Sequence, residues 1–169
     1  MVQAALIPNC ISYDPTFSYE MAVIIHDGMR RMYVNQEDIY YYITAMNENY
    51  QQPALPEGAN EGILKGMYLF QGGGKKKKKV QLLGSGTILR EAIAAAEILS
   101  EEWGVDSDIW SCTSFNELAR EANDVERWNR LHPLENPKVP YVSQLLKGHR
   151  GPVIAATDYI RQYPEQIRQ

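Results

Sequence analysis

Histidine, cysteine and paired acidic residues most often carry catalysis or bind metals, and this sequence has few of them in a useful arrangement. His26, His132 and His149 lie far apart, with no His-Glu-x-x-His pattern and no cysteine at metal-ligand spacing. Adjacent residues on a helix do not face each other, which argues against a proton-transfer pair between His26 and Asp27. We expect Cys10 and Cys112 to be buried thiols of a reducing compartment. The sequence therefore predicts no metal-binding residue.

Glu48 is the carboxylate with the most interesting position. It lies in Asn47-Glu48-Asn49-Tyr50, directly after a tyrosine-rich segment that we expect to form a strand. Ligands of open α/β sheets bind at the carboxyl ends of strands, which would place Glu48 beside a ligand. The alternative, which we favour, is a polar loop that satisfies its own turn. No nucleophile elbow, Walker loop or paired-carboxylate spacing accompanies Glu48.

Gly84-Ser85-Gly86 lies between an expected strand and an expected helix, where backbone amides can hold a phosphate. The dinucleotide-binding fingerprint needs a third glycine three residues after Gly86, and that position is Leu89. We therefore favour a tight strand-to-helix turn over a phosphate site.

Lys75 to Lys79 form a dense positive cluster directly after Gly72-Gly73-Gly74. Such a cluster can bind phosphate or nucleic acid. Glycines and repelling charges are also typical of a solvated, mobile linker, which we favour. Residues 72–79 are thus expected to be an exposed linker without a ligand, so that serines in place of the five lysines leave thermal stability almost unchanged.

The elements that position these residues fall into two α/β portions. Residues 1–71 should contain strands at Asn9–Tyr13 and Ile39–Thr44, the second β-branched, aromatic and buried. Between them, Asp14 should cap a helix with Pro15 at its first position. The expected apolar face of this helix comprises Met21, Ile25, Met29 and Met32. Residues 61–70 suggest a short helix followed by a strand near 67–70.

Residues 80–169 alternate strands with helices, which predicts a mainly parallel sheet with right-handed crossovers. The expected strands are Val80–Leu83, Asp108–Cys112 and Val153–Ala156. One helix should span Ile88–Trp103 and end at Gly104. Three further features are a capping box from Ser114 to Glu117, a proline-rich loop at 133–140, and a last helix capped by Asp158.

Composition excludes several protein classes. Charged residues make up 22% of the 169 residues, which is typical of a globular protein. The net charge of −4 argues against a general nucleic-acid binder. No apolar run approaches the roughly 20 residues that span a bilayer, and no secretory signal is recognisable. We expect a cytoplasmic protein that binds neither nucleic acid nor membranes.

Long strings of this sequence resemble one enzyme family, the homodimeric bacterial type of the pyruvate dehydrogenase decarboxylating component. The resembling segments are Ile7–Pro15, Tyr40–Thr44, Asn47–Tyr50, Pro53–Gly58, Val80–Gly86, Thr113–Arg120 and Glu126–Asn129. The resemblance covers nearly the whole chain. It implies that residues 1–71 are the end of a pyrimidine-binding thiamine-fold domain. Residues 80–169 would then be the start of a transketolase C-terminal-like domain, with 72–79 as a Gly/Lys linker.

The resemblance also implies a reaction that this chain cannot complete. The family decarboxylates pyruvate with thiamine diphosphate and magnesium, passes the acetyl group to a lipoyl carrier of an acetyltransferase component, and works as a homodimer. In the family, the diphosphate and metal ligands, the activating glutamate and the active-site histidines all precede this segment. The last strands of the C-terminal domain are missing as well, and Met1 in mid-domain suggests a truncated product or an expressed fragment.

No catalytic, cofactor-binding or metal-binding residue is therefore carried onto this chain. We expect an enzyme fragment that is inactive alone and binds no cofactor. One alternative is a self-sufficient α/β module for a phosphate-bearing ligand, suggested by Gly84-Ser85-Gly86 and Asp158. Another is an interaction piece that self-associates through exposed apolar surface.

Overall fold

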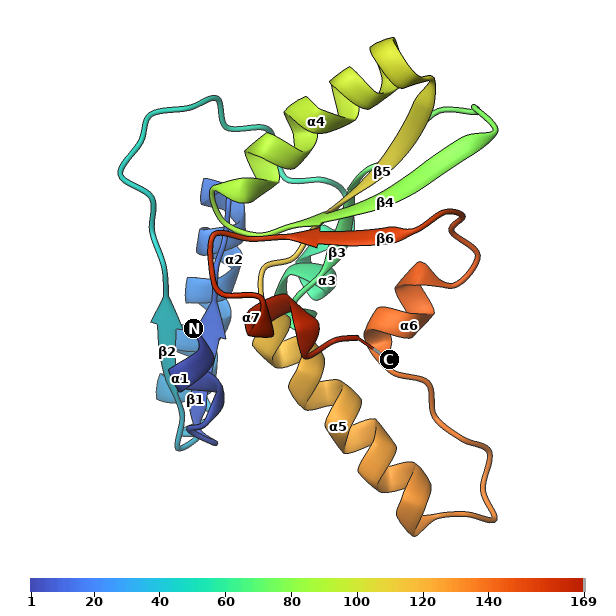
Figure 1. The fold of residues 1–169 in the computed structure, drawn as a ribbon. Helices are drawn as coiled ribbons and strands as arrows, with labels where there is room; N and C mark the ends of the chain where they lie inside the picture. The colour runs from blue at the N-terminus through green and yellow to red at the C-terminus, as the bar shows by residue number, and fades with distance from the viewer. Residues whose placement is uncertain (169) are drawn as a thin grey trace.

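A computed structural model describes residues 1–168 and contains two β-sheets (Figure 1). The small sheet pairs β1 (Cys10–Tyr13) in parallel with β2 (Tyr40–Ile43). The larger sheet has the order β3-β5-β4-β6, formed by β3 (Tyr68–Gln71), β4 (Lys78–Gly84), β5 (Val105–Ser111) and β6 (Val153–Ala156). Only β3 is antiparallel to its neighbour, which confirms the predicted mainly parallel sheet.

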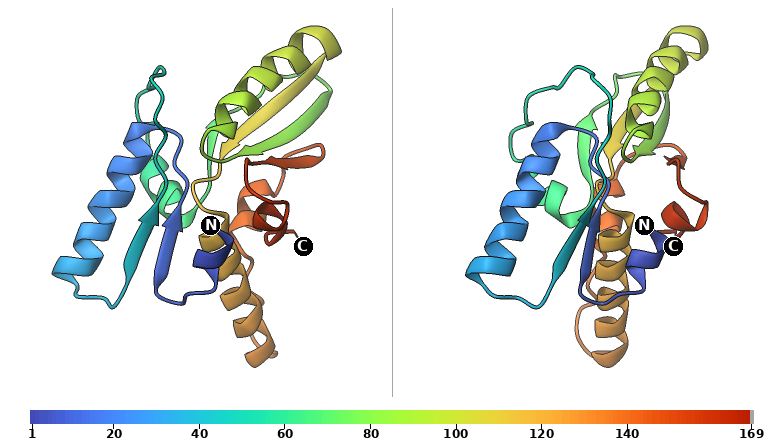
Figure 2. Two further views of the ribbon diagram at one scale, coloured as in Figure 1. Left: turned by 60° about the vertical axis from the view of Figure 1, so that its left-hand side comes forward. Right: turned by 90° about the vertical axis from the view of Figure 1, so that its left-hand side faces the viewer.

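Helices cover both faces of the larger sheet (Figures 1 and 2). α4 (Ile88–Trp103) packs on one face, where Ala92 contacts Val80 and Leu82. α5 (Phe115–Leu131), α6 (Tyr141–Leu146) and α7 (Gln162–Glu165) cover the other face. There Leu83 and Trp110 pack against Phe115, Val142 and Tyr163. Alternate residues of β4 thus point to opposite faces, as the period of a strand requires.

The first portion places its helices around the small sheet. α1 (Val2–Ala5) precedes β1, and α2 (Ser18–Met29) continues into a π-helical turn at Arg30–Val34 before β2. α3 (Ala59–Lys65) then leads into β3, which confirms the helix and strand expected within residues 61–70. No described helix combines the length and apolar character needed to cross a membrane.

The prediction for the buried face of α2 was wrong. Ile25 and Met29 are 45% and 57% exposed, whereas Ile24 is fully buried. Gly28 faces the small sheet and lets the Tyr41 ring approach the helix, since a Cβ there would lie 3.3 Å from the ring. The buried face also carries Glu20 and Asp27, two carboxylates that the apolar periodicity could not assign to the interior.

The start of α2 also differs from the prediction. Asp14 does not cap this helix and Pro15 is not its first residue, because the chain bends at Thr16 and Phe17 and the helix begins only at Ser18. Glu20 in the first turn reaches back instead, and its Oε2 accepts from the amides of Thr16 and Phe17 at 2.6 and 2.9 Å. A carboxylate near a helix N-terminus is favourable because it meets unpaired amides.

β2 is half exposed and not buried as predicted. Tyr40 and Tyr42 are 43% and 48% exposed, while Tyr41 points toward α2. Within residues 1–168, β2 pairs only with β1, so it is an edge strand with one open edge. A continuous run of aromatic residues does not distinguish a central strand from such an edge.

The boundaries of the second portion follow the prediction closely, except that β4 starts two residues early, at Lys78, and three further elements differ. α4 and β6 have the predicted bounds, whereas β5 starts three residues early, at Val105. α6 follows Pro140 in the stretch that we expected to be a loop. The last helix begins at Gln162 after Arg161, so Asp158 does not cap it. Four- and six-residue helices are too short to show a clear periodicity.

Residues 72 and 74–78 are exposed, as predicted, whereas Gly73 and Lys79 are half-buried, and the segment is not a free linker. Lys78 and Lys79 already belong to β4. The amides of Gly73 and Lys76 donate to the carboxylates of Asp108 and Asp106, both at 2.7 Å. β3, which we placed in the first portion, pairs with β5. Buried aspartates of β5 therefore hold this segment along the edge of the larger sheet.

We predict that Asp108 makes stability depend on pH in the acid range. Burial opposes its ionisation, but hydrogen bonds from His149, Gly73 and Gln81 outweigh burial and lower its pKa from 3.8 to about 2. A depressed pKa in the folded state stabilises the protein above pH 3.8, and this contribution is lost as the pH falls through about 2. Asp108→Asn should therefore cost about 2 kcal/mol near pH 6.

Urea unfolding at several pH values measures this effect. The difference between Asp108→Asn and the parent chain should shrink as the pH falls from 4 toward 2, because the parent carboxylate becomes protonated. Asp124→Asn, at an exposed position of α5, is the matched control and should leave the free energy of unfolding unchanged at every pH. A difference that is the same at every pH would contradict the assignment to the Asp108 charge.

Candidate functional site

The carboxyl ends of four strands from both sheets meet at one place. β1, β2, β4 and β6 end there, and the residues that follow them line a common cavity of about 360 Å³. These lining residues include Asp14, Thr44, Thr87 and Asp158, one from each strand end. Ligands of open α/β sheets bind at such ends, which makes this junction the candidate site.

Asp14 is the centre of the junction. It is 5% exposed, and its Oδ1 accepts from the Thr44 hydroxyl at 2.5 Å and from the Tyr159 hydroxyl at 3.4 Å. Its backbone carbonyl accepts from the Gly86 amide at 3.1 Å. Burial raises the pKa of Asp14, the Thr44 hydrogen bond offsets part of this effect, and the negative charge of Asp158 adds to it. One residue thus links the ends of β1, β2 and β4 with the segment after β6, through both its side chain and its backbone.

Gly84-Ser85-Gly86 forms the tight strand-to-helix turn that we predicted, with Gly86 at a φ of +50°. A Cβ at Gly86 would lie 2.7 Å from both carboxylate oxygens of Asp14. The amides of Ile88 and Leu89 at the start of α4 already donate to the carbonyls of Ser85 and Gly86. The protein's own carboxylate therefore lies where a phosphate would have to approach, and two negative groups repel each other.

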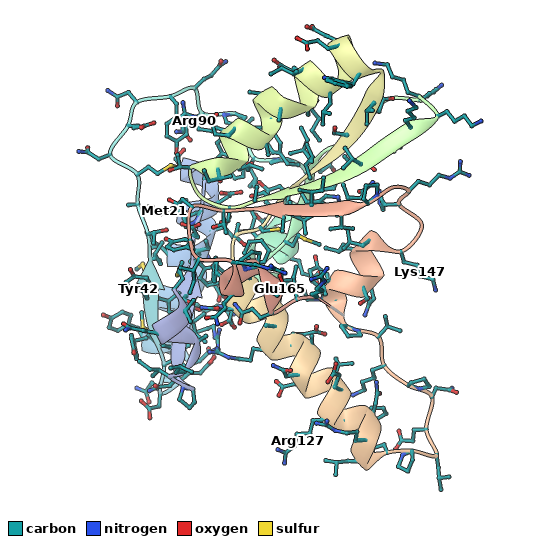
Figure 3. All side chains as sticks on the ribbon, viewed as in Figure 1. Met21, Tyr42, Arg90, Arg127, Lys147 and Glu165 are labelled. Carbon is teal, nitrogen blue, oxygen red and sulfur yellow. The ribbon has the colours of Figure 1, made fainter. Side chains whose placement is uncertain are left out.

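Glu48 follows β2 at this edge, as predicted, but its carboxylate forms an ion pair within the chain. Its Oε2 lies 2.7 Å from Nη1 of Arg90, whose guanidinium also lies over the Tyr50 ring at 4.4 Å. Figure 3 shows Arg90 at the start of α4, beside the loop that follows β2. The side chain of Glu48 is 60% exposed. This geometry favours the polar-loop interpretation, because Glu48 fastens the loop to α4.

A second set of contacts, which sequence reasoning missed, surrounds Glu20 between the two portions. Glu20 is fully buried, and its Oε1 accepts from the hydroxyls of Tyr68 on β3 and Ser111 on β5 at 2.7 and 2.6 Å. With the two amides at its own helix start, Glu20 has four donors. Burial raises its pKa, and the hydrogen bonds from Ser111 and Tyr68 oppose that shift. The signal in the sequence was a glutamate in a first helical turn, which is typical of a solvent-exposed cap.

The histidines do not come together. The Nδ1 of His132 donates to the Trp128 carbonyl at 2.8 Å, and the Nδ1 of His149 lies 2.9 Å from the Asp108 carboxylate. His26 lines a separate groove between α2 and α3. Within residues 1–168, no group of three His, Cys, Asp or Glu side chains is arranged to hold a metal ion.

Cys10 and Cys112 are buried free thiols, as expected from the sequence. Complete burial raises the pKa of Cys112 well above its ordinary value. A thiol of this kind is a poor nucleophile because the thiolate is the reactive form. The polar groups of the junction link the two sheets, since Asp14 accepts hydrogen bonds from Thr44 after β2 and from Tyr159 after β6.

Two family models match the chain, one on each portion. Residues 1–53 match the pyruvate dehydrogenase E1 component middle domain, and residues 66–169 match the transketolase-like TK C-terminal domain. The Pseudomonas aeruginosa and Escherichia coli K12 proteins named pyruvate dehydrogenase E1 component are 60% and 57% identical over 98% and 99% of this chain. The protein of that name from Cupriavidus necator is 61% identical over 97% of the chain. The chain spans 18–19% of the length of these relatives.

We predict that Gly86→Ala destabilises the chain more than Gly104→Ala. Both glycines have positive φ, but a Cβ at Gly104 meets nothing within 4 Å. Gly104→Ala should therefore cost only the backbone strain, about 1 kcal/mol. Gly86→Ala adds a collision with the Asp14 carboxylate and should cost at least about 2 kcal/mol more. Denaturant unfolding of both variants measures the difference, and equal costs would show that Asp14 does not press on this turn.

Proposed function

The chain belongs to the pyruvate dehydrogenase E1 component family, and we propose that it forms the rigid connection between that enzyme's middle domain and its transketolase-like C-terminal domain. The observation that carries this proposal is the position of Glu20 and Asp14. Each is buried, and each receives hydrogen bonds from both portions of the chain. A buried carboxylate with donors from two sheets fixes the position of one sheet relative to the other.

The parent reaction, in this proposal, is the decarboxylation of pyruvate and the transfer of the acetyl group to a lipoyl carrier of the acetyltransferase component. We expect the complete enzyme to be a cytoplasmic homodimer. Thiamine diphosphate, when bound to that enzyme, supplies a carbanion that adds to the keto group and a ring that accepts electrons. The chain described here contributes the ends of β1 and β2 and the surface around them.

The residues of this chain do not fit thiamine diphosphate. A diphosphate needs a divalent cation or oriented cationic donors to balance its charge. Among the described residues, the lining of the cavity at the strand ends includes Asp14, Glu48 and Asp158 but no Lys or Arg, and the guanidinium of Arg90 is engaged by Glu48. Like charges would repel the diphosphate from this cavity. The chain alone is therefore proposed to bind no cofactor and to be inactive.

The same acidic lining argues against the alternative of a phosphate-binding module. The alternative of a self-associating piece has a specific observation in its favour. In the described part of the chain, β6 pairs only with β4, its four residues carry no charge, and Val153 and Ile154 are 49% and 51% exposed. An uncharged open edge is a template for pairing with another chain. Association through this edge is compatible with the structural role proposed above.

We predict that the purified chain binds neither thiamine diphosphate nor magnesium-thiamine diphosphate and releases no carbon dioxide from pyruvate. Calorimetric titration and a carbon dioxide assay check this directly. The complete E1 component of a relative, assayed in parallel, is the positive control for cofactor and substrate. Saturable micromolar binding by this chain, or carbon dioxide release above the level without protein, would show that the active-site residues lie within it.

A further inference from the structure

The outer edge of β6 presents backbone groups that no strand within residues 1–168 uses. β6 is the last strand of the order β3-β5-β4-β6, so only one of its edges is paired (Figure 1). The Gln81 amide on β4 donates to the Pro152 carbonyl at 2.9 Å. Backbone groups of successive residues point to opposite edges of a strand, so Ile154 faces β4 whereas Val153 and Ala155 face outward. The amides and carbonyls of these two outward residues are therefore free to pair with a further strand.

Both faces of β6 leave room for the side chains of such a strand. Val153 and Ile154 point to opposite faces of the sheet, and each is about half exposed. On the face of Val153, a cavity of about 880 Å³ runs beside β6, and its lining includes Leu83, Val142 and Leu146. The four residues of β6 carry no charge, so burying this edge costs no desolvation of a charged group.

A second copy of the chain fits this edge in antiparallel pairing. Two residues that exchange hydrogen bonds across an antiparallel pair must point their backbone groups toward each other. Val153 of one copy and Ala155 of the other meet this condition when Ile154 lies opposite Ile154 of the second copy. Arg150 and Asp158 lie four positions before and after Ile154. The same register therefore brings Arg150 of each copy beside Asp158 of the other.

The charges at the two ends of β6 favour this register. Arg150 and Asp158 are exposed, and neither forms an ion pair within residues 1–168. Opposite charges across paired strands are stabilising, and like charges are destabilising. A shift by two residues would keep the backbone hydrogen bonds but separate both charge pairs. We propose that β6 pairs with β6 of a second copy in this register, which joins the two larger sheets edge to edge. The pairing goes beyond the connecting role proposed above and does not depend on it.

Sedimentation velocity of the complete chain over a range of concentrations tests the association. The paired segment is short, so we expect a monomer–dimer equilibrium with a dissociation constant of about 100 µM. Arg150→Asp places like charges across both ends of the strand pair and should weaken dimerisation by about tenfold or more. Asp158→Arg should have the same effect. Arg127→Asp, at an exposed position of α5 remote from β6 (Figure 3), is the control and should leave the dissociation constant unchanged.

A mixture of the two variants tests the register. Arg150→Asp and Asp158→Arg in equal amounts should form a mixed dimer as readily as the parent chain, because each introduced charge then meets a charge of opposite sign. Amide hydrogen exchange of the parent chain tests the edge itself. The amides of Val153 and Ala155 should become protected as the concentration rises, whereas the Ile154 amide should be protected at every concentration because it faces β4.

Three outcomes would overturn the proposal. The first is a chain that stays monomeric up to about 1 mM, which would show that a second copy does not occupy this edge. The second is a dimer in which Val153 and Ala155 remain unprotected, which would place the interface elsewhere. The third is a mixture that does not recover dimerisation although each variant has the circular dichroism spectrum of the parent chain. If a variant does not fold, the exchange pattern of Val153 and Ala155 in the parent chain decides.

Discussion

A buried carboxylate holds the molecule together. Glu20 lies at the start of α2 in the first portion, yet two of its four hydrogen bonds come from β3 and β5 of the larger sheet. Removing such a group would leave several buried donors without an acceptor, and each of them costs about 1–3 kcal/mol. Apolar packing also joins the two portions, because Phe17 contacts Leu89 and Ile109 across the boundary. The two portions therefore pack into one unit and are not independent domains joined by a flexible linker.

Once the two sheets are fixed in this way, their strand ends must meet. β1 runs parallel to β2, and β4 runs parallel to β6, so each sheet presents its carboxyl ends at one edge. The Thr16 hydroxyl donates to the Gly86 carbonyl at 2.7 Å, and the Ser114 hydroxyl donates to the Ser12 carbonyl at 2.6 Å. These bonds cross the boundary on both sides of Asp14. The acidic cavity is a consequence of how the sheets are joined.

Much of the fold could be predicted because its signals are local. α4 has a long amphipathic pattern that ends at a glycine, and the Ser114 hydroxyl accepts from the Glu117 amide at 3.0 Å, as the capping pattern indicated. The reciprocal half of that box is absent, because the Ser114 amide donates to the Gly66 carbonyl. A tertiary partner thus replaces a local one, which no short sequence window can show.

The candidate site could not be predicted for the same reason. Asp14-Pro15 has the composition of a helix start, and Glu20 has that of an exposed cap. Yet the carboxylates accept hydrogen bonds from residues that lie 145 and 91 positions away in the sequence. The lysine-rich segment has the composition of a linker, but Asp106 and Asp108 hold its backbone. In each case, the deciding partner lies on the other portion or on a distant strand. Composition gives the charge of these residues but does not identify the group that forms a hydrogen bond or ion pair with each of them.

The most direct test of this account is whether the two portions unfold together. Amide hydrogen exchange can follow Ile11 of β1 and Ile109 of β5 in the parent chain, in Glu20→Ala and in Glu97→Ala, an exposed control on α4. In the parent chain and the control, both amides should exchange with the same free energy of opening. In Glu20→Ala, both values should fall together by about 3 kcal/mol or more. An opening of Ile11 that is much easier than that of Ile109 in the parent chain would contradict the claim that one buried carboxylate joins the portions.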